Sequence, residues 1–376
     1  MPILETAVNG LKLPNPFVIG SGPPGTNANV IGKALDEGWG AVIAKTISLD
    51  ASKVINVAPR YARLRTEKSR EVYGWQNIEL ISDRPFDVWV DEFNRVKDKY
   101  PTGVVIASIM EEYNRDRWVE IVERTQATGV DAFELNFSCP HGLPERKMGA
   151  AMGQDCGIMG EVCKWVVEAS KIPVWAKLTP NVTHIQDGCE AALRAGCHGV
   201  SAINTILCVM GVDLDTLRPE PTVEGYTTPG GYSCTAVRPI ALRMVKECAE
   251  TIRDKFPNQD RTLSAIGGVE SGADAAQFIL LGGDTVQVCT GVMKMGYDMV
   301  KRMKDELLSF MAKHNFENIE AFKGHSLQYF TTHADLVKRQ AEAKAAAKAK
   351  AKGMVTKDGE WQGDDFVKQS DALARG

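Results

Sequence analysis

Short apolar runs rich in β-branched residues alternate along most of this chain with longer segments whose apolar residues recur every three or four positions. The first pattern predicts buried strands and the second predicts amphipathic helices. Strands are expected at residues 17–20, 41–46, 104–108, 132–136, 174–177, 199–204, 262–267 and 285–289. Helices are expected between them, for example at residues 118–128, 157–170, 185–195, 239–255 and 272–281.

Eight strands, each followed by a helix, over about three hundred residues predict an α/β fold, the (β/α)8 TIM barrel. An open, doubly wound sheet is the alternative, and it normally carries a glycine-rich fingerprint after its first strand. The segment Ser21-Gly22-Pro23-Pro24-Gly25 occupies that place here, and its glycines are in a different order. The barrel is therefore favoured.

Three segments do not fit the strand–helix alternation. Residues 48–85 and 208–235 form long connections, which are usually functional in compact domains, and both would overhang the carboxyl-terminal face of a barrel, the second as a lid. Residues 338–352 are almost wholly Ala, Lys, Glu, Gln and Arg, which favours a helix that Gly353 would end. We expect a barrel domain over residues 1–320 and an extension over 321–376, either a solvated tail or an arm that docks a subunit.

The composition is that of a globular protein with no nucleic-acid or membrane partner. Of 376 residues, 44% are hydrophobic and 24% charged, and the net charge is −4, which indicates neither a nucleic-acid-binding face nor affinity for anionic lipid. No apolar run of eighteen residues and no secretory signal is visible, so we expect a cytoplasmic protein.

The nine cysteines are spaced too widely for a typical metal site. They stand at positions 139, 156, 163, 189, 197, 208, 234, 248 and 289, with no closely spaced pair. Iron–sulfur clusters and structural zinc usually use such pairs. Most of these thiols are therefore expected in the core.

Polar residues follow several predicted strands, and they point to chemistry at one end of the barrel. Lys45, Asn136, Lys177, Asn204 and Cys289 stand at or next to carboxyl ends of different strands, where barrel enzymes gather their active sites. The run from Asn136 through Ser138 and Cys139 to Gly142 is the most informative. Alone, its amide could cap a loop and its thiol could be buried. Together they could hold a planar, amide-rich ring and offer it a proton, since a thiol of pKa about 8.5 is mostly protonated at neutral pH.

This run resembles the active-site loop of dihydropyrimidine dehydrogenases and, more loosely, that of dihydroorotate dehydrogenases. The likeness extends in order from about residue 3 to about residue 310. Its other motifs are Lys45-Thr46, Asn77-Ile78-Glu79-Leu80, the segment from Ala176 to Thr183, Asn204-Thr205, Ile266-Gly267-Gly268 and Cys289-Thr290.

The resemblance implies an FMN enzyme that reduces the 5,6 double bond of a uracil- or thymine-like pyrimidine, or oxidises the dihydropyrimidine. Hydride would pass from N5 of the flavin, and Cys139 would be the catalytic proton donor. The residues implied for the cofactor are Ser21, Lys45, Thr46, Lys177, Cys234, Ile266, Gly267, Gly268, Cys289 and Thr290. Those implied for the substrate are Asn77, Glu79, Asn136, Ser138, Asn204 and Thr205.

The sequence departs from the family pattern in two ways, which affect the source of electrons and the packing around the flavin. No cysteine precedes Cys139 or follows Cys289, so no iron–sulfur cluster is expected in this chain. Electrons would then come from a partner subunit with FAD and iron–sulfur clusters, in a homo- or hetero-oligomer, or from a nicotinamide or soluble carrier. Cys234 replaces a glycine of the family pattern close to the flavin.

Other functions remain open on this scaffold. A related enzyme could act on dihydroorotate or another cyclic amide, with Arg65 as the cation for a carboxylate. The chain could also be a non-catalytic flavin-binding subunit, or a non-redox barrel such as an aldolase or isomerase.

Overall fold

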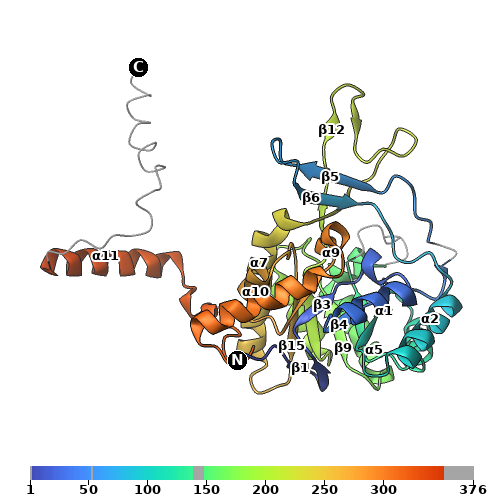
Figure 1. Cartoon of the computed structure of the whole chain (residues 1–376), viewed down its shortest axis with the longest axis horizontal. Helices are drawn as coiled ribbons and strands as arrows, with labels where there is room; N and C mark the ends of the chain where they lie inside the picture. The colour runs from blue at the N-terminus through green and yellow to red at the C-terminus, as the bar shows by residue number, and fades with distance from the viewer. Residues whose placement is uncertain (1, 52–53, 139–147, 351–376) are drawn as a thin grey trace. The chain divides into compact units, whose positions relative to one another are not determined.

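The computed structural model describes residues 2–51, 54–138 and 148–350, with side chains up to residue 343. Eight parallel strands close into a barrel, as the sequence predicted (Figure 1). They are β3 (Phe17–Ile19), β4 (Ala41–Ile43), β7 (Val105–Ile109), β8 (Ala132–Asn136), β9 (Val174–Lys177), β10 (Gly199–Ala202), β15 (Thr262–Ile266) and β16 (Thr285–Val288). Neighbours in this order pair with one another, and β16 pairs with β3 to close the ring.

Helices connect successive strands on the outside of the barrel. They are α1 (Ala28–Glu37), α2 (Phe86–Lys99), α3 (Arg115–Gln126), α4 (Ala150–Gly153), α5 (Cys156–Ala169), α6 (Ile185–Arg194), α7 (Arg238–Lys255), α8 (Gly272–Leu280), α9 (Thr290–Met295) and α10 (Met299–His314). Local chemistry fixes several of their starts. The side chains of Asn27, Asn114, Asp155 and Ser271 accept hydrogen bonds from the first-turn N–H groups of α1, α3, α5 and α8. Gly38 ends α1 in the left-handed conformation, with φ of 95°.

A two-stranded hairpin covers the amino-terminal end of the barrel. It consists of β1 (Thr6–Val8) and β2 (Leu11–Leu13), which the sequence pattern did not reveal. Val8 and Leu13 are buried in one apolar cluster with residues of the barrel strands. Nε1 of Trp175 donates to Oδ1 of Asn9 at 2.6 Å, which ties the hairpin to β9. This end is therefore closed by packing.

A second sheet stands beyond the carboxyl-terminal end of the barrel. Its strands are β5 (Tyr61–Arg65), β6 (Val72–Asn77), β11 (Ile206–Cys208) and β14 (Gly230–Ser233), in the antiparallel order β11-β14-β6-β5. A small hairpin of β12 (Val212–Asp213) and β13 (Arg218–Pro219) lies beyond it, near β5 and β6 in Figure 1. Apart from the start of β11, these strands lie within the two long connections, residues 48–85 and 208–235, for which no strands were predicted.

The chain divides into two compact units, Met1–Leu327 and Gln328–Gly376. The first contains the barrel and the second sheet. The second contains α11 (His333–Lys350), the helix that the Ala- and Lys-rich composition predicts; Gly353 lies outside the described residues. Within the described chain, no helix combines the length and hydrophobicity needed to cross a bilayer.

Candidate active site

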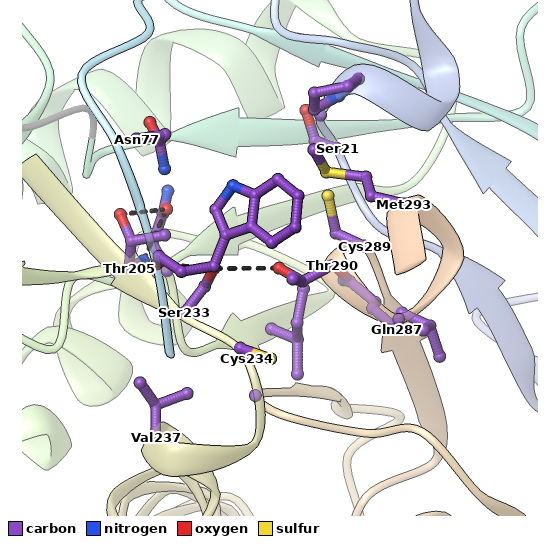
Figure 2. A pocket seen from close by; sticks show the side chains of 18 of the residues that line it. Ser21, Asn77, Thr205, Ser233, Cys234, Val237, Gln287, Cys289, Thr290 and Met293 are labelled. Atoms are coloured by element: carbon purple, nitrogen blue, oxygen red, sulfur yellow. Dashed lines mark hydrogen bonds between the residues drawn. The ribbon is translucent and has the colours of Figure 1, made fainter. Parts of the chain in front are cut away.

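A cavity opens at the carboxyl ends of the barrel strands, bounded on one side by the second sheet (Figure 2). Its empty volume is about 1180 Å³, open solvent included. All residues predicted to contact the cofactor line it: Ser21, Lys45, Thr46, Lys177, Cys234, Ile266, Gly267, Gly268, Cys289 and Thr290. So do the predicted substrate residues Asn77, Glu79, Asn136, Asn204 and Thr205. The fold thus brings residues from nine segments of the chain to one cavity.

A chain of hydrogen bonds crosses the floor of this cavity from strand to strand. Oγ of Ser21 lies 3.2 Å from Oγ1 of Thr46, which accepts from Nδ2 of Asn136 at 3.0 Å. Oδ1 of Asn136 in turn accepts from Nδ2 of Asn204 at 3.2 Å. Oδ1 of Asn204 accepts from the backbone N–H of Thr205 at 2.8 Å. Because each amide is oriented by its neighbours, these groups are preorganised rather than free to rotate.

Ser138 is joined to this network through its backbone. Its backbone N–H donates to Oδ1 of Asn136 at 3.0 Å. Its side chain is fully buried, and its Oγ has no hydrogen-bond partner among the described residues. It does not line the cavity, so its predicted contact with a substrate stays a prediction. The predicted catalytic residue Cys139 lies outside the described residues.

Lys45 is paired with a buried carboxylate at the edge of the cavity. Its Nζ lies 2.7 Å from Oε1 of Glu79, and Arg60 approaches the same oxygen at 3.4 Å. The hydroxyl of Tyr61 donates to Oε2 of Glu79 at 2.9 Å. Burial, and then the charge of Glu79, raise the pKa of Tyr61, so the phenol stays protonated. Glu79 thus joins the second sheet to the barrel.

Lys177 is the second lysine that lines the cavity, and its ammonium group contacts buried polar side chains inside the barrel. Its Nζ lies 3.1 Å from Oε1 of Glu134 and donates to Oε1 of Gln287 at 3.1 Å. The carboxylate of Glu134 is fully buried and also accepts from Ser201 at 2.7 Å and from Gln287 at 2.8 Å. Both lysines therefore form ion pairs and also line the cavity.

Two turns at the other side of the cavity present backbone and hydroxyl donors. Gly267 and Gly268, both at positive φ, follow β15 and line the cavity. The next residues lead to Ser271, which caps α8. The hydroxyls of Ser233 and Thr290 lie 2.9 Å apart across the second turn, joined by a dashed line in Figure 2. A glycine turn that leads into the amino-terminal end of a helix suits an anion such as a phosphate.

Two thiols line the same side of the cavity. Burial raises the pKa of the Cys289 thiol to about 11, although the charge of Lys177 opposes this. Burial also raises the pKa of the Cys234 thiol, which lies 3.5 Å from Oε1 of Glu270 and 3.7 Å from Nζ of Lys294. Both side chains are therefore neutral thiols at pH 7. The eight cysteines within the described residues are all free, and no group of three His, Cys, Asp or Glu side chains there is arranged to hold a metal.

Sequence reasoning missed several residues of the site. Tyr61 and Trp75 line the cavity from β5 and β6, and Glu134 and Gln287 support Lys177 from below. A charged or amide residue within an otherwise buried strand, as in β8 and β16, is a signal that could have identified the last two. Arg65, considered as a cation for a carboxylate substrate, is exposed, donates to the backbone carbonyl of Arg70 and does not line the cavity.

Comparison with known proteins gives a family match and close relatives. The family model described as dihydroorotate dehydrogenase matches residues 3–311. A protein of Arabidopsis thaliana named dihydropyrimidine dehydrogenase (NADP(+)), chloroplastic, is 61% identical over 99% of this chain and 88% of its own. The NAD-dependent dihydropyrimidine dehydrogenase subunit PreA of Escherichia coli (strain K12) is 37% identical over 84% of this chain and 74% of its own.

Among solved structures, DHODH from Eimeria tenella in complex with ferulenol aligns with a TM-score of 0.70. The alignment covers 86% of this chain and 88% of that one. At 21% sequence identity, this likeness supports the barrel fold alone.

Proposed function

Since this chain belongs to the dihydroorotate dehydrogenase family, we propose that it is an FMN-dependent enzyme that reduces the 5,6 double bond of uracil- or thymine-like pyrimidines, or catalyses the reverse oxidation. It is an oxidoreductase acting on CH–CH groups. The observation that carries the proposal is the oriented row of amides and hydroxyls from Ser21 to Thr205, flanked by two lysines in one cavity.

The phosphate of FMN fits the side of the cavity formed by the two turns. Gly267 and Gly268 line it with their backbone, and Ser233 and Thr290 offer hydroxyls. In the proposed arrangement these groups hold the phosphate, and the amino-terminal end of α8 adds its positive potential. A side chain at Gly268 would meet the backbone oxygen of Cys234 at 2.6 Å, so the turn requires glycine.

In this proposal Lys45 and Lys177, which both line the cavity, face the pyrimidine edge of the flavin. A positive charge at that edge stabilises the anionic form of the reduced ring. Glu79 and Glu134 lie 2.7 Å and 3.1 Å from the two ammonium groups and hold them in place.

The row of amides suits a pyrimidine that alternates carbonyl and N–H groups. Each of Asn77, Asn136 and Asn204 provides one acceptor and two donor hydrogens. Asn136 and Asn204 are oriented by their mutual hydrogen bond, and Asn77 by the carbonyl of Gly231 at 3.2 Å. Glu79, Ser138 and Thr205 are proposed to complete the substrate contacts.

When bound, FMN supplies a hydride from its N5 to one carbon of the 5,6 double bond. We assign the proton for the neighbouring carbon to the thiol of Cys139, which leaves a thiolate that solvent reprotonates. In the reverse direction the thiolate accepts that proton. In the sequence Cys139 comes directly after Ser138, three residues past Asn136, the last residue of β8; its own position lies outside the described residues.

Replacement of Cys139 by Ala tests this assignment. We expect Cys139→Ala to lose most of its turnover with uracil, while FMN binding, measured by the visible spectrum, is retained. Cys156→Ala, in the first turn of α5, serves as the control and should keep the wild-type rate. A Cys139→Ala enzyme with near-full rate would remove the thiol from the mechanism.

The electron donor is proposed from the names of the relatives. The Escherichia coli relative is named a subunit, so we propose a partner subunit, carrying FAD and iron–sulfur clusters, that passes electrons from a nicotinamide. Direct reduction by a nicotinamide or a soluble carrier is the alternative, and assays of the purified chain with NADPH or NADH separate the two. A cytoplasmic location stays a prediction, since the name of the plant relative places that protein in the chloroplast.

A further inference from the structure

Trp75 stands in the cavity wall with an unused hydrogen-bond donor. It belongs to β6, lines the cavity and is only 7% exposed. Its Nε1 has no partner among the described residues. An indole N–H can only donate, and leaving such a group buried and unpaired is unfavourable. Among the described residues the indole N–H of Trp75 therefore has no acceptor, and a bound ligand can supply one.

The indole is held in place from the second sheet. Cζ of Arg63 lies 4.3 Å from the centroid of the Trp75 ring, and the ring of Tyr61 packs against it edge-on, with centroids 5.9 Å apart. The backbone carbonyl of Trp75 accepts from Oγ of Ser233 at 3.2 Å. These contacts explain how the ring is positioned, and none of them uses its N–H.

The position of Trp75 along β6 indicates which part of a ligand its indole would contact. Trp75 and Asn77 are two residues apart and both line the cavity, so they share one face of the strand, about 7 Å apart. Oγ of Ser233 donates to the backbone carbonyl of Trp75 and also lies beside Oγ1 of Thr290, in the second of the two turns proposed to hold the phosphate. Trp75 thus lies between the turns that suit a phosphate and the amides that suit a pyrimidine.

We infer that Trp75 is a cofactor-binding residue: its indole packs against the bound flavin and its Nε1–H donates to an acceptor atom of that flavin. Arg63 and Tyr61 act as positioning residues that hold the indole. The inference rests on the proposed FMN enzyme. It adds a contact made by the second sheet, which therefore contributes to the affinity for FMN.

The test compares Trp75→Phe with Trp39→Phe in purified apo- and FMN-loaded protein. Phe keeps an aromatic ring and removes the N–H. Trp39 is also buried, but its N–H donates to the carbonyl of Tyr297 at 2.8 Å and it does not line the cavity. We expect Trp75→Phe to weaken FMN binding roughly two- to tenfold, as for one lost hydrogen bond, and Trp39→Phe to leave the affinity unchanged.

Two further readouts separate a binding role from a structural one. Without FMN, Trp75→Phe should melt at or above the wild-type temperature, because an unpaired buried group is removed, whereas Trp39→Phe should melt lower. Bound FMN should be more fluorescent in Trp75→Phe, because a stacked indole quenches flavin emission.

Wild-type FMN affinity and emission in Trp75→Phe would overturn the inference, as would a lower melting temperature of its apo form. If the wild-type chain bound no FMN, the proposed function itself would fail, and this outcome is separate from the other two.

Discussion

Cys234 adopts a backbone conformation that glycine, and few other residues, tolerates. Its φ is 80° and its ψ is −170°, a region that costs a residue with a side chain about 1–3 kcal/mol. The family pattern has glycine at this position. We therefore expect Cys234→Gly to relieve backbone strain that Cys234→Ala retains.

The difference between these two variants isolates the strain. Both remove the buried thiol and its contacts with Glu270 and Lys294, so that loss cancels. Glycine is disfavoured by its greater freedom in the unfolded chain, by about 0.5–1 kcal/mol. Subtracting this from the strain leaves about 0–2.5 kcal/mol, and from the middle of that range we expect Cys234→Gly to be more stable than Cys234→Ala by about 1 kcal/mol.

Equilibrium urea unfolding, followed by far-UV circular dichroism, measures the difference. The control pair is Cys248→Gly and Cys248→Ala, at a fully buried position within α7. There the helix should make Ala the more stable by about 1 kcal/mol. The reasoning is refuted if Ala is as stable as Gly at position 234, or if the two positions rank the substitutions in the same order.

Two further predictions concern buried carboxylates. Glu134→Ala leaves the ammonium of Lys177 without its anion and should lower the free energy of unfolding by about 3–5 kcal/mol. Adding Lys177→Met should recover part of this loss in the same urea unfolding assay. If the double variant recovers no stability, the ion pair does not contribute as described. Glu92 accepts from the backbone N–H of Ala28 and from Arg84, each at 2.6 Å, and these bonds hold its pKa below the usual value despite the opposing effect of burial. The ionised Glu92 carboxylate therefore stabilises the folded protein fully at pH values above its unfolded-state pKa. This stabilisation is lost as the pH falls through the lower folded-state pKa. Glu92→Gln should destabilise the protein at pH 7 by about 1.5–3 kcal/mol, with a gap to wild type that narrows below about pH 4; a gap independent of pH would refute this.

The barrel could be predicted because its signals are local. Each strand is a short apolar run, and each helix has an amphipathic pattern and often a cap such as Asn27 or Ser271. The polar residues at the strand ends could then be placed together, because parallel strands in a barrel share one carboxyl-terminal face. The cavity brings them together, although their roles stay predictions.

The second sheet could not be predicted by the same means. Asn77 and Gly231 pair across β6 and β14, although 154 positions separate them in the sequence. The strands are short, contain glycines and are only partly buried, so no periodic apolar pattern marks them. Their pairing depends on the barrel, which holds both connections above the same face.

By itself, the sequence determined the class of fold, the order of its strands and the end of the barrel where the chemistry gathers. Tertiary structure alone decided which groups meet there: the pairing of Lys45 with Glu79, the support of Lys177 by Glu134, and the placement of Trp75 in the cavity wall. The physical reason is the distance along the sequence over which each kind of interaction acts. Hydrophobic periodicity and capping act within a few residues, whereas ion pairs and buried donors are set by neighbours that only the closed barrel brings within 3 Å or so.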